Sequence, residues 1–357
     1  MLHGGDIYHN KVTWDFSVNI NPLGVPETVK NALMEAIEHS SEYPDLNAEK
    51  LTRNLSRMSG VAQERIQFGN GASELFFAIV HAIKPGKTLI PVPSFFGYEK
   101  AAMAACGEII FYPMKQEHGF CLDEEFSTVL TKEVDLVFLA NPNNPVGNLI
   151  SPSLLERLAL HCKDHQIILV LDECFLEFTQ NEQEYSFKGK LEQYPNVVVV
   201  RAFTKIFAIP GVRLGYLFCS DQELKKRIAT HLPEWNLSVF AQMAGAAACQ
   251  ETGYLKESIE IVQREREFLT WALEEMGIRV FPSTADFLLI TTNLPLYDGL
   301  LAKEILLRDC SNFRGLGAGY YRIAVKNHRE NRILIKAIRE WKEIMDASDR
   351  ICTSGGN

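Results

Sequence analysis

The middle of the chain alternates short apolar runs with segments whose apolar residues recur at helical spacing. The apolar runs predict strands at 66–69, 88–92, 109–113, 134–140, 167–171 and 197–203. Helices are predicted between them at 73–83, 98–105 and 151–165, the last opened by Ser151 and Pro152. Strands alternating with helices predict an α/β fold: a mostly parallel sheet covered by helices on both faces.

The pattern changes after about residue 250. Residues 254–276 predict one long charged helix, and 279–292 predict two strands around a turn. A helix at 299–308, a strand at 321–325 and a last helix at 329–345 follow. We therefore expect a smaller α+β C-terminal domain at 249–357, a large domain at 41–248, and an N-terminal arm at 1–40 that is rich in Asn, Pro and Gly.

Composition narrows the classes of protein. The 357 residues are 46% hydrophobic and carry a net charge of −9 without a basic block, which disfavours a nucleic-acid binder. No apolar run approaches the ~20 residues that cross a bilayer, so no membrane partner is expected. The N-terminus has no leader pattern, and the eight cysteines form no C-x-x-C pair. These features predict a cytoplasmic protein with reduced thiols and no metal site.

Chemistry-bearing residues follow successive predicted strands, and the first is Lys205 in the run TKIFAIPGVRLG at 204–215. A lysine at the carboxyl end of a buried strand is partly desolvated, has a lowered pKa and can form a Schiff base. Thr204 and Arg213 supply a hydroxyl and a planar cation that suit a phosphate. An ordinary surface loop with two cations explains this segment alone about equally well.

Two polar residues end the neighbouring strands. Asp172 is either a turn residue or a carboxylate that pairs with a cationic ring nitrogen, as pyridoxal phosphate requires. Asn144, in NPNNPVG at 141–147, is either part of a plain turn or an amide aimed at a ligand oxygen.

Two further segments suit an anion and a flat ring. FGNGASE at 68–74 brings backbone N–H groups to the start of a helix, although it is neither a dinucleotide fingerprint nor a Walker A loop. Phe95, in PVPSFF at 91–96, is either a core residue or a stacking face. Because all five segments end strands of one parallel sheet, we expect them to meet at one edge.

Taken together, these residues resemble the fold-type I pyridoxal phosphate enzymes of the aspartate aminotransferase superfamily over nearly the whole chain. The resemblance is nearest to the branch of histidinol-phosphate aminotransferases and threonine-phosphate decarboxylases. It favours the decarboxylases in four motifs: HGG at 3–5, DFSVNINPLG at 15–24, YPD at 43–45 and AIPGVRLGY at 208–216.

The resemblance implies a role for each matching residue. Lys205 would carry pyridoxal 5'-phosphate, Asp172 would pair with its ring nitrogen, Asn144 would bond its ring hydroxyl and Phe95 would stack on the ring. The cofactor phosphate would take the backbone of Ala72, Ser73 and Glu74, together with Thr204 and Arg213. Tyr43 would reach the cofactor phosphate of a partner subunit, which implies a homodimer with shared sites.

Substrate-binding roles are implied as well. Arg322 corresponds to the family's carboxylate-binding arginine, and Arg308 to the arginine that this branch uses for a substrate phosphate. His3 and Asn19 would close over the substrate from the arm, or else only pack in the dimer. The implied substrate is a small phosphorylated amino acid or amine.

Three departures from the family pattern bear on the reaction. Ala202 replaces a Ser or Thr phosphate ligand, which weakens the expected hold on the cofactor, and Val146 replaces a Thr in a turn. Phe175 replaces a tyrosine of the aminotransferases and is shared with the decarboxylases. Decarboxylation of L-threonine O-3-phosphate to aminopropanol phosphate, a step of cobalamin biosynthesis, is the expected reaction. Transamination of histidinol phosphate in histidine biosynthesis stays the alternative, and a non-catalytic cofactor-binding module is disfavoured because Lys205 and Asp172 are both present.

Overall fold

A seven-stranded sheet forms the centre of the protein in the computed structural model, which describes residues 4–354 and side chains as far as residue 347. The strand order is β2-β8-β7-β6-β5-β3-β4. All strands run parallel except β8, which is antiparallel to both of its neighbours. The strands are β2 (Ile66–Gly69), β3 (Lys87–Val92), β4 (Glu108–Pro113), β5 (Leu136–Ala140), β6 (Ile168–Asp172), β7 (Val197–Ala202) and β8 (Gly215–Cys219). The sequence prediction of a mostly parallel sheet is confirmed, whereas the antiparallel β8 was not predicted.

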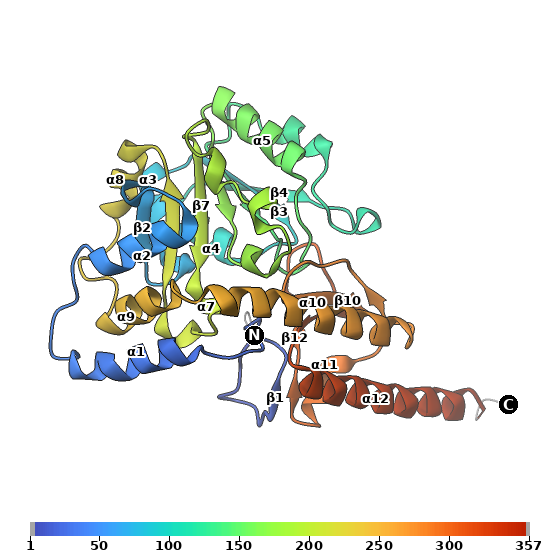
Figure 1. The fold of residues 1–357 in the computed structure, drawn as a ribbon. Helices are drawn as coiled ribbons and strands as arrows, with labels where there is room; N and C mark the ends of the chain where they lie inside the picture. Colours follow the sequence, from blue (N-terminus) through green and yellow to red (C-terminus); the bar gives the residue numbers. More distant parts are fainter. Residues whose placement is uncertain (1–3, 355–357) are drawn as a thin grey trace.

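Helices cover both faces of this sheet (Figure 1). Alternate side chains of β7 explain the two layers, since Val198 and Val200 enter one apolar cluster and Val197 and Val199 the other. The first cluster includes α3 (Ala72–Ile83), α4 (Gly97–Ala104) and α8 (Gln222–Ala229). The second includes α2 (Glu49–Ser59), α5 (Pro152–Asp164) and α9 (Val239–Ala248). Ser151 caps α5 through the backbone N–H of Leu154, as the sequence predicts.

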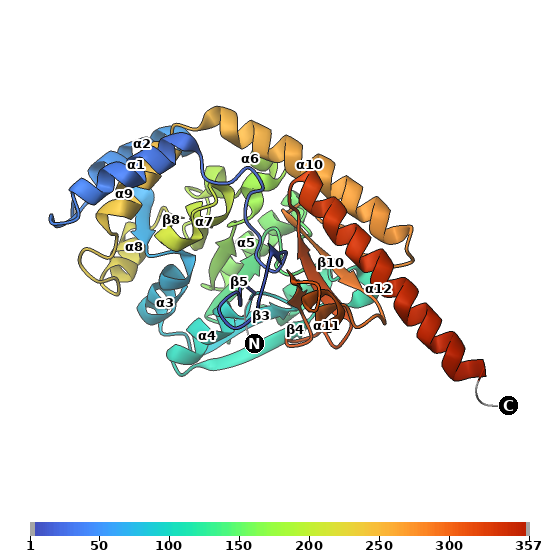
Figure 2. The ribbon, with the colours of Figure 1, turned by 90° about the horizontal axis from the view of Figure 1, so that it is seen from below.

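A four-stranded antiparallel sheet of order β12-β13-β10-β9 follows in the C-terminal part. Its strands are β9 (Arg279–Val280), β10 (Phe287–Thr291), β12 (Arg308–Asp309) and β13 (Tyr320–Ala324). One face packs on α10 (Thr252–Glu274), α11 (Leu296–Leu301) and α12 (His328–Ser354). Figure 2 shows α10 running from the large sheet to the small one, and α12 projecting beyond the body of the protein.

The N-terminal segment contacts both the C-terminal part of the protein and the helices of the large sheet. Its strand β1 (Trp14–Asp15) pairs in parallel with β11 (Ile305–Leu306), and its helix α1 (Glu27–Glu38) packs beside α9. The domain boundaries at 40 and 248 stay a prediction. No helix among the described residues is long and apolar enough to traverse a lipid bilayer.

The predicted helix at 299–308 is wrong beyond residue 301. Glu304 has a positive φ of 59°, which ends helical geometry, and residues 305–306 and 308–309 form β11 and β12. Their partners, β1 and β13, come from other parts of the chain. Strand pairing with distant segments therefore outweighs the local preference of Leu and Ala for a helix.

Candidate active site

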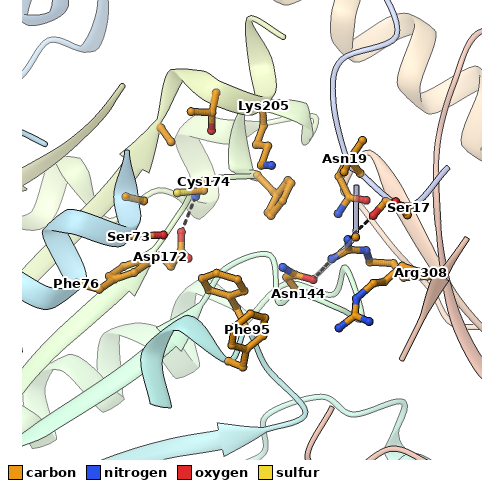
Figure 3. A pocket seen from close by; sticks show the side chains of 18 of the residues that line it. Ser17, Asn19, Ser73, Phe76, Phe95, Asn144, Asp172, Cys174, Lys205 and Arg308 are labelled. Carbon is orange, nitrogen blue, oxygen red and sulfur yellow. Dashed lines mark hydrogen bonds between the residues drawn. The ribbon is translucent and has the colours of Figure 1, made fainter. Parts of the chain in front are cut away.

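A cavity of about 300 Å³ opens where the carboxyl ends of the parallel strands face the C-terminal sheet. Eleven of the fourteen residues predicted for the site line this cavity, and Figure 3 shows Lys205, Asp172 and Asn144 pointing into it from three sides. The eleven are Asn19, Ala72, Ser73, Phe95, Asn144, Asp172, Thr204, Lys205, Arg213, Arg308 and Arg322. The sequence prediction that these segments meet at one edge is confirmed by their position.

Lys205 belongs to the short helix α7 (Phe203–Ile206), which follows β7 directly. Phe203 and Ile206 are buried beneath it, so the helix is anchored while the lysine side chain enters the cavity. Burial lowers the pKa of Lys205, because the charged ammonium loses water around it. An amine with a lowered pKa is a better nucleophile at neutral pH.

Asp172 ends β6 and is held by two donors. The Tyr98 hydroxyl donates to its Oδ2 at 2.5 Å, and the backbone N–H of Cys174 donates to its Oδ1 at 3.0 Å. Burial raises the pKa of Asp172, while both hydrogen bonds and the charge of Lys205 oppose this rise. A cationic ring nitrogen placed against the carboxylate would supply the missing counter-charge.

The start of α3 forms an anion cradle with Arg213. Gly71 caps this helix at φ 79°, and a Cβ there would lie 2.4 Å from Nη2 of Arg213. Gly215 approaches equally closely, since a Cβ on it would lie 2.5 Å from the backbone N of Ala72. The free N–H groups at a helix N-terminus, a guanidinium and the Thr204 hydroxyl together suit a phosphate group.

Arg322 spans the opposite wall of the cavity. Its Nη1 donates to Asn144 Oδ1 at 2.5 Å and its Nη2 donates to the carbonyl of Ser17 at 2.9 Å (Figure 3). Its Nε is buried without a partner among the described residues, as is Oδ1 of Asn19. Burial lowers the pKa of Arg322 to about 10. Unpartnered buried polar atoms that line a cavity are ready to bind a polar ligand.

Arg308 lies on β12, opposite Arg322 in the strand register. Its guanidinium bonds to the carbonyl of Asp309 and, at 2.8 Å, to Oδ1 of Asn312, and lies 5.0 Å from the centre of the Phe313 ring. These contacts fix two cations side by side on one wall of the cavity.

Three predicted residues do not line the cavity. Glu74 turns its carboxylate away, where it accepts from the backbone of Asn70 and from Asn236. Tyr43 is 81% exposed and its ring lies 4.7 Å from that of Trp235. His3 lies outside the described residues. The structure does not test their roles, which stay predictions.

Sequence reasoning missed Tyr98, which supports Asp172 from outside the cavity lining, and Ser17 and Phe313, which line the cavity. Tyr98 carries no motif, and its only signal was a place in the first turn after the PVPSFF segment. Ser17 and Phe313 line the cavity from the arm and from the segment after β12. Of the three departures from the family pattern, Ala202 and Phe175 line the cavity, and Val146 is fully buried in the same apolar cluster as Phe281.

These residues fit pyridoxal phosphate in each part of its structure. The cavity provides an amine, a carboxylate for a ring nitrogen, an aromatic face and an anion cradle, all at one sheet edge. The fold and the site therefore define a pyridoxal phosphate enzyme with the α/β architecture of aminotransferases.

Comparison with known proteins supports this class. The family model for aminotransferase class I and II matches residues 11–338. A threonine-phosphate decarboxylase from Salmonella typhimurium is 34% identical over 91% of this chain and 90% of its own length. The crystal structure of a histidinol-phosphate aminotransferase from Clostridium acetobutylicum superposes with a TM-score of 0.85 at 33% identity, covering 91% of this chain and 97% of that one.

A second structural neighbour is the L-threonine-O-3-phosphate decarboxylase from Porphyromonas gingivalis. Its TM-score is 0.81 at 29% identity, covering 92% of this chain and 99% of that chain. The chain therefore belongs to the class I and II aminotransferase family and is a pyridoxal phosphate-dependent enzyme. Relatives of both reaction types lie at similar distances, so the similarity alone does not choose between the two reactions.

Proposed function

We propose that the enzyme decarboxylates L-threonine O-3-phosphate to aminopropanol phosphate. The observation that carries this proposal is the pair of arginines on one wall of the cavity, Arg308 and Arg322, opposite each other on β12 and β13. Two fixed cations suit a substrate that carries two anionic groups at once, a carboxylate and a phosphate. Histidinol phosphate carries only the phosphate, and glutamate, the other amino donor of the alternative reaction, carries two carboxylates but no phosphate.

Each residue of the cavity would contact a different part of the cofactor or substrate. Pyridoxal phosphate, when bound, supplies the electron sink that weakens bonds at the substrate Cα. Arg322 would bind the carboxylate and Arg308 the phosphate, which orients the substrate across the cavity from Lys205. Asn19, on the arm, offers a buried carbonyl oxygen to the substrate amine. Phe175 places a ring, without a hydroxyl, at the cofactor side of the cavity.

Orientation of the carboxylate determines which bond breaks. The bond held perpendicular to the cofactor ring is the one weakened, so a carboxylate rotated out of the ring plane leaves as CO₂. Removal of the Cα hydrogen by Lys205 would give transamination instead. By holding the phosphate and the carboxylate at two fixed points, Arg308 and Arg322 would limit rotation about the bond between the substrate nitrogen and Cα.

A single-turnover reaction with L-threonine O-phosphate tests this proposal. We expect stoichiometric CO₂, aminopropanol phosphate and unchanged pyridoxal phosphate. Absence of CO₂, together with conversion of the cofactor to pyridoxamine phosphate by histidinol phosphate or glutamate, would refute decarboxylation and establish transamination. The variant Lys205→Ala is the control and is expected to release no CO₂ and to retain no cofactor after borohydride reduction and denaturation.

We also propose a cytoplasmic homodimer in which Tyr43 completes the partner's site. Tyr43, Leu46 and Trp235 are exposed apolar residues near one another in the chain's large part, which supports a buried subunit contact there. Mixing subunits that carry Tyr43→Ala with subunits that carry Lys205→Ala should restore activity, because each hybrid contains one intact site. No recovery in a verified hybrid dimer would refute sharing.

A further inference from the structure

Asp286 is a buried carboxylate that the proposed reaction does not yet use. It lies directly before β10 and its side chain is fully buried. Neither of its carboxylate oxygens accepts a hydrogen bond from any described residue. Buried carboxylates are normally bonded by several donors, so this arrangement calls for a functional explanation.

Four cations lie near enough to Asp286 to interact with its charge. They are Lys205 on α7, Arg266 on α10, Arg322 on β13 and Lys326 just after that strand, and each interacts with Asp286 through its charge. Burial raises the pKa of Asp286 to about 7, and the charges of Lys205 and Arg322 limit this rise. Asp286 in turn opposes the lowering of the pKa of Lys205 by burial.

The segment that carries Asp286 is fixed at the contact between the two sheets. The backbone N–H of Thr284 donates to the carbonyl of Gly147 at 2.9 Å, and Arg266 donates to the carbonyl of Thr284 at 3.0 Å. The N–H of Val325 donates to the carbonyl of Asp286 itself at 2.8 Å. The carboxylate is therefore held by its backbone and not by hydrogen bonds of its own, which leaves its charge free to act on the neighbouring cations.

We propose that Asp286 is a positioning residue whose buried carboxylate is the counter-ion of Lys205 and Arg322, and that it keeps the Lys205 amine protonated for donation to the substrate. This inference rests on the proposed decarboxylation. In that reaction the bond between Cα and the carboxylate carbon breaks, CO₂ leaves, and the bonding electron pair stays with the substrate. A proton must then form the new Cα–H bond, and water returns a proton to the lysine afterwards.

Decarboxylation needs a proton donor at Cα after CO₂ has left, whereas transamination begins with a base that removes the Cα hydrogen. Burial alone favours an uncharged lysine, which would accept a proton, whereas a nearby carboxylate favours the ammonium. Asp286 therefore biases Lys205 toward the form that decarboxylation uses. The same carboxylate balances the buried charge of Arg322, which has no carboxylate partner within hydrogen-bond distance among the described residues.

Labelling of the cofactor-free enzyme tests the counter-ion directly. Acetic anhydride modifies only uncharged amines, so the labelling rate of Lys205 against pH, measured by peptide mass spectrometry, reports its protonation; Lys256, 80% exposed, serves as the internal standard. We expect Asp286→Asn to increase the rate at Lys205 by about three- to tenfold at a pH where most of the wild-type amine is charged.

Two further variants make the comparison specific. Asp286→Glu keeps the charge and should label nearly as the wild type does. Asp164→Asn makes the same chemical change on the exposed surface of α5 and should leave the rate unchanged. If Asp286→Asn gives too little folded protein, Asp286→Ala takes its place. Equal labelling of Lys205 in the wild type and the neutral variant would overturn the proposal.

The pH profile of CO₂ release separates this inference from the proposed function. In Asp286→Asn the alkaline limb of single-turnover CO₂ release should move to lower pH, because Lys205 loses its proton earlier, and Asp286→Glu should restore the limb. A general loss of activity with an unmoved limb would indicate a merely structural role and refute the inference. If the wild type releases no CO₂ at all, the proposed function fails, and the labelling experiment still decides whether Asp286 is the counter-ion.

Discussion

Removing one hydroxyl group, in Tyr98→Phe, should weaken cofactor binding. The Tyr98 hydroxyl donates to Asp172 at 2.5 Å and favours the ionised carboxylate against the effect of burial. A hydrogen bond to a charged group contributes about 1.5–3 kcal/mol. Asp172 must be ionised only when it pairs with the cationic ring nitrogen, so the free energy of the lost hydrogen bond is subtracted from the free energy of cofactor binding. We expect the dissociation constant of pyridoxal phosphate to rise by about ten- to a hundredfold.

The surroundings of Tyr98 make this substitution a clean one. Its ring is 1% exposed, stacks on Phe138 at 5.1 Å with an interplanar angle of 6°, and meets Phe76 and Phe95 edge to face. The phenylalanine ring therefore stays in place and only the hydrogen bond is removed.

Titration of the cofactor-free enzyme with pyridoxal phosphate, followed by visible absorbance, measures the effect. Tyr112→Phe is the matched control, because Tyr112 also donates to an aspartate, Asp123 at 2.8 Å, and Asp123, unlike Asp172, does not line the cavity. It should bind the cofactor as the wild type does. Binding by Tyr98→Phe within twofold of the wild type would refute the view that Asp172 depends on this hydroxyl.

Three further changes probe other parts of the protein. Gly71→Ala should reduce cofactor affinity, measured in the same titration, because its Cβ would lie 2.4 Å from Arg213 at a φ of 79°, whereas Gly211→Ala meets nothing within 4 Å and should not. Arg322→Lys should raise KM for an amino-acid substrate by about tenfold or more in steady-state assays, since a lysine cannot keep the planar two-way fork. Burial raises the pKa of Glu177 to about 7 from 4.5, so the folded protein binds a proton that the unfolded chain releases, and stability present below pH 4.5 is lost as the pH rises through 7. In urea unfolding at pH 8, Glu177→Gln should therefore be more stable by up to about 3 kcal/mol, and unchanged stability would contradict this.

The sequence predicted the cofactor side of the site because local signals and topology coincide there. Lys205, Asp172 and Asn144 each follow an apolar run, and parallel strands bring their carboxyl ends to one edge. Short-range pattern is then sufficient to place residues that are far apart in the chain.

The substrate side of the cavity could not be predicted in the same way, because its residues are positioned by contacts between distant parts of the chain. Arg308 was expected on a helix and lies on β12, because β11 beside it pairs with β1 from the opposite end of the chain. Asp286 lies in a segment whose sequence predicts a plain turn, and only the three-dimensional fold shows that it is buried near four cations. Tertiary pairing and burial, which decide both cases, cannot be read from periodicity.

The hydrogen bonding of the cavity differs between its two walls, and this difference locates the control of the reaction. On the cofactor wall, Asp172 already has both of its oxygens bonded, so this wall is preorganised before any ligand binds. On the opposite wall, Asn19 and Arg322 each keep a buried polar atom without a partner among the described residues, and behind that lining Asp286 keeps two. Leaving such atoms unpaired costs free energy, which a substrate can recover only if its own polar groups meet them. The wall that gains free energy when the correct substrate binds is therefore also the wall that orients the bonds at the substrate Cα. Substitutions on this wall should change which bond breaks, whereas they should have less effect on cofactor binding.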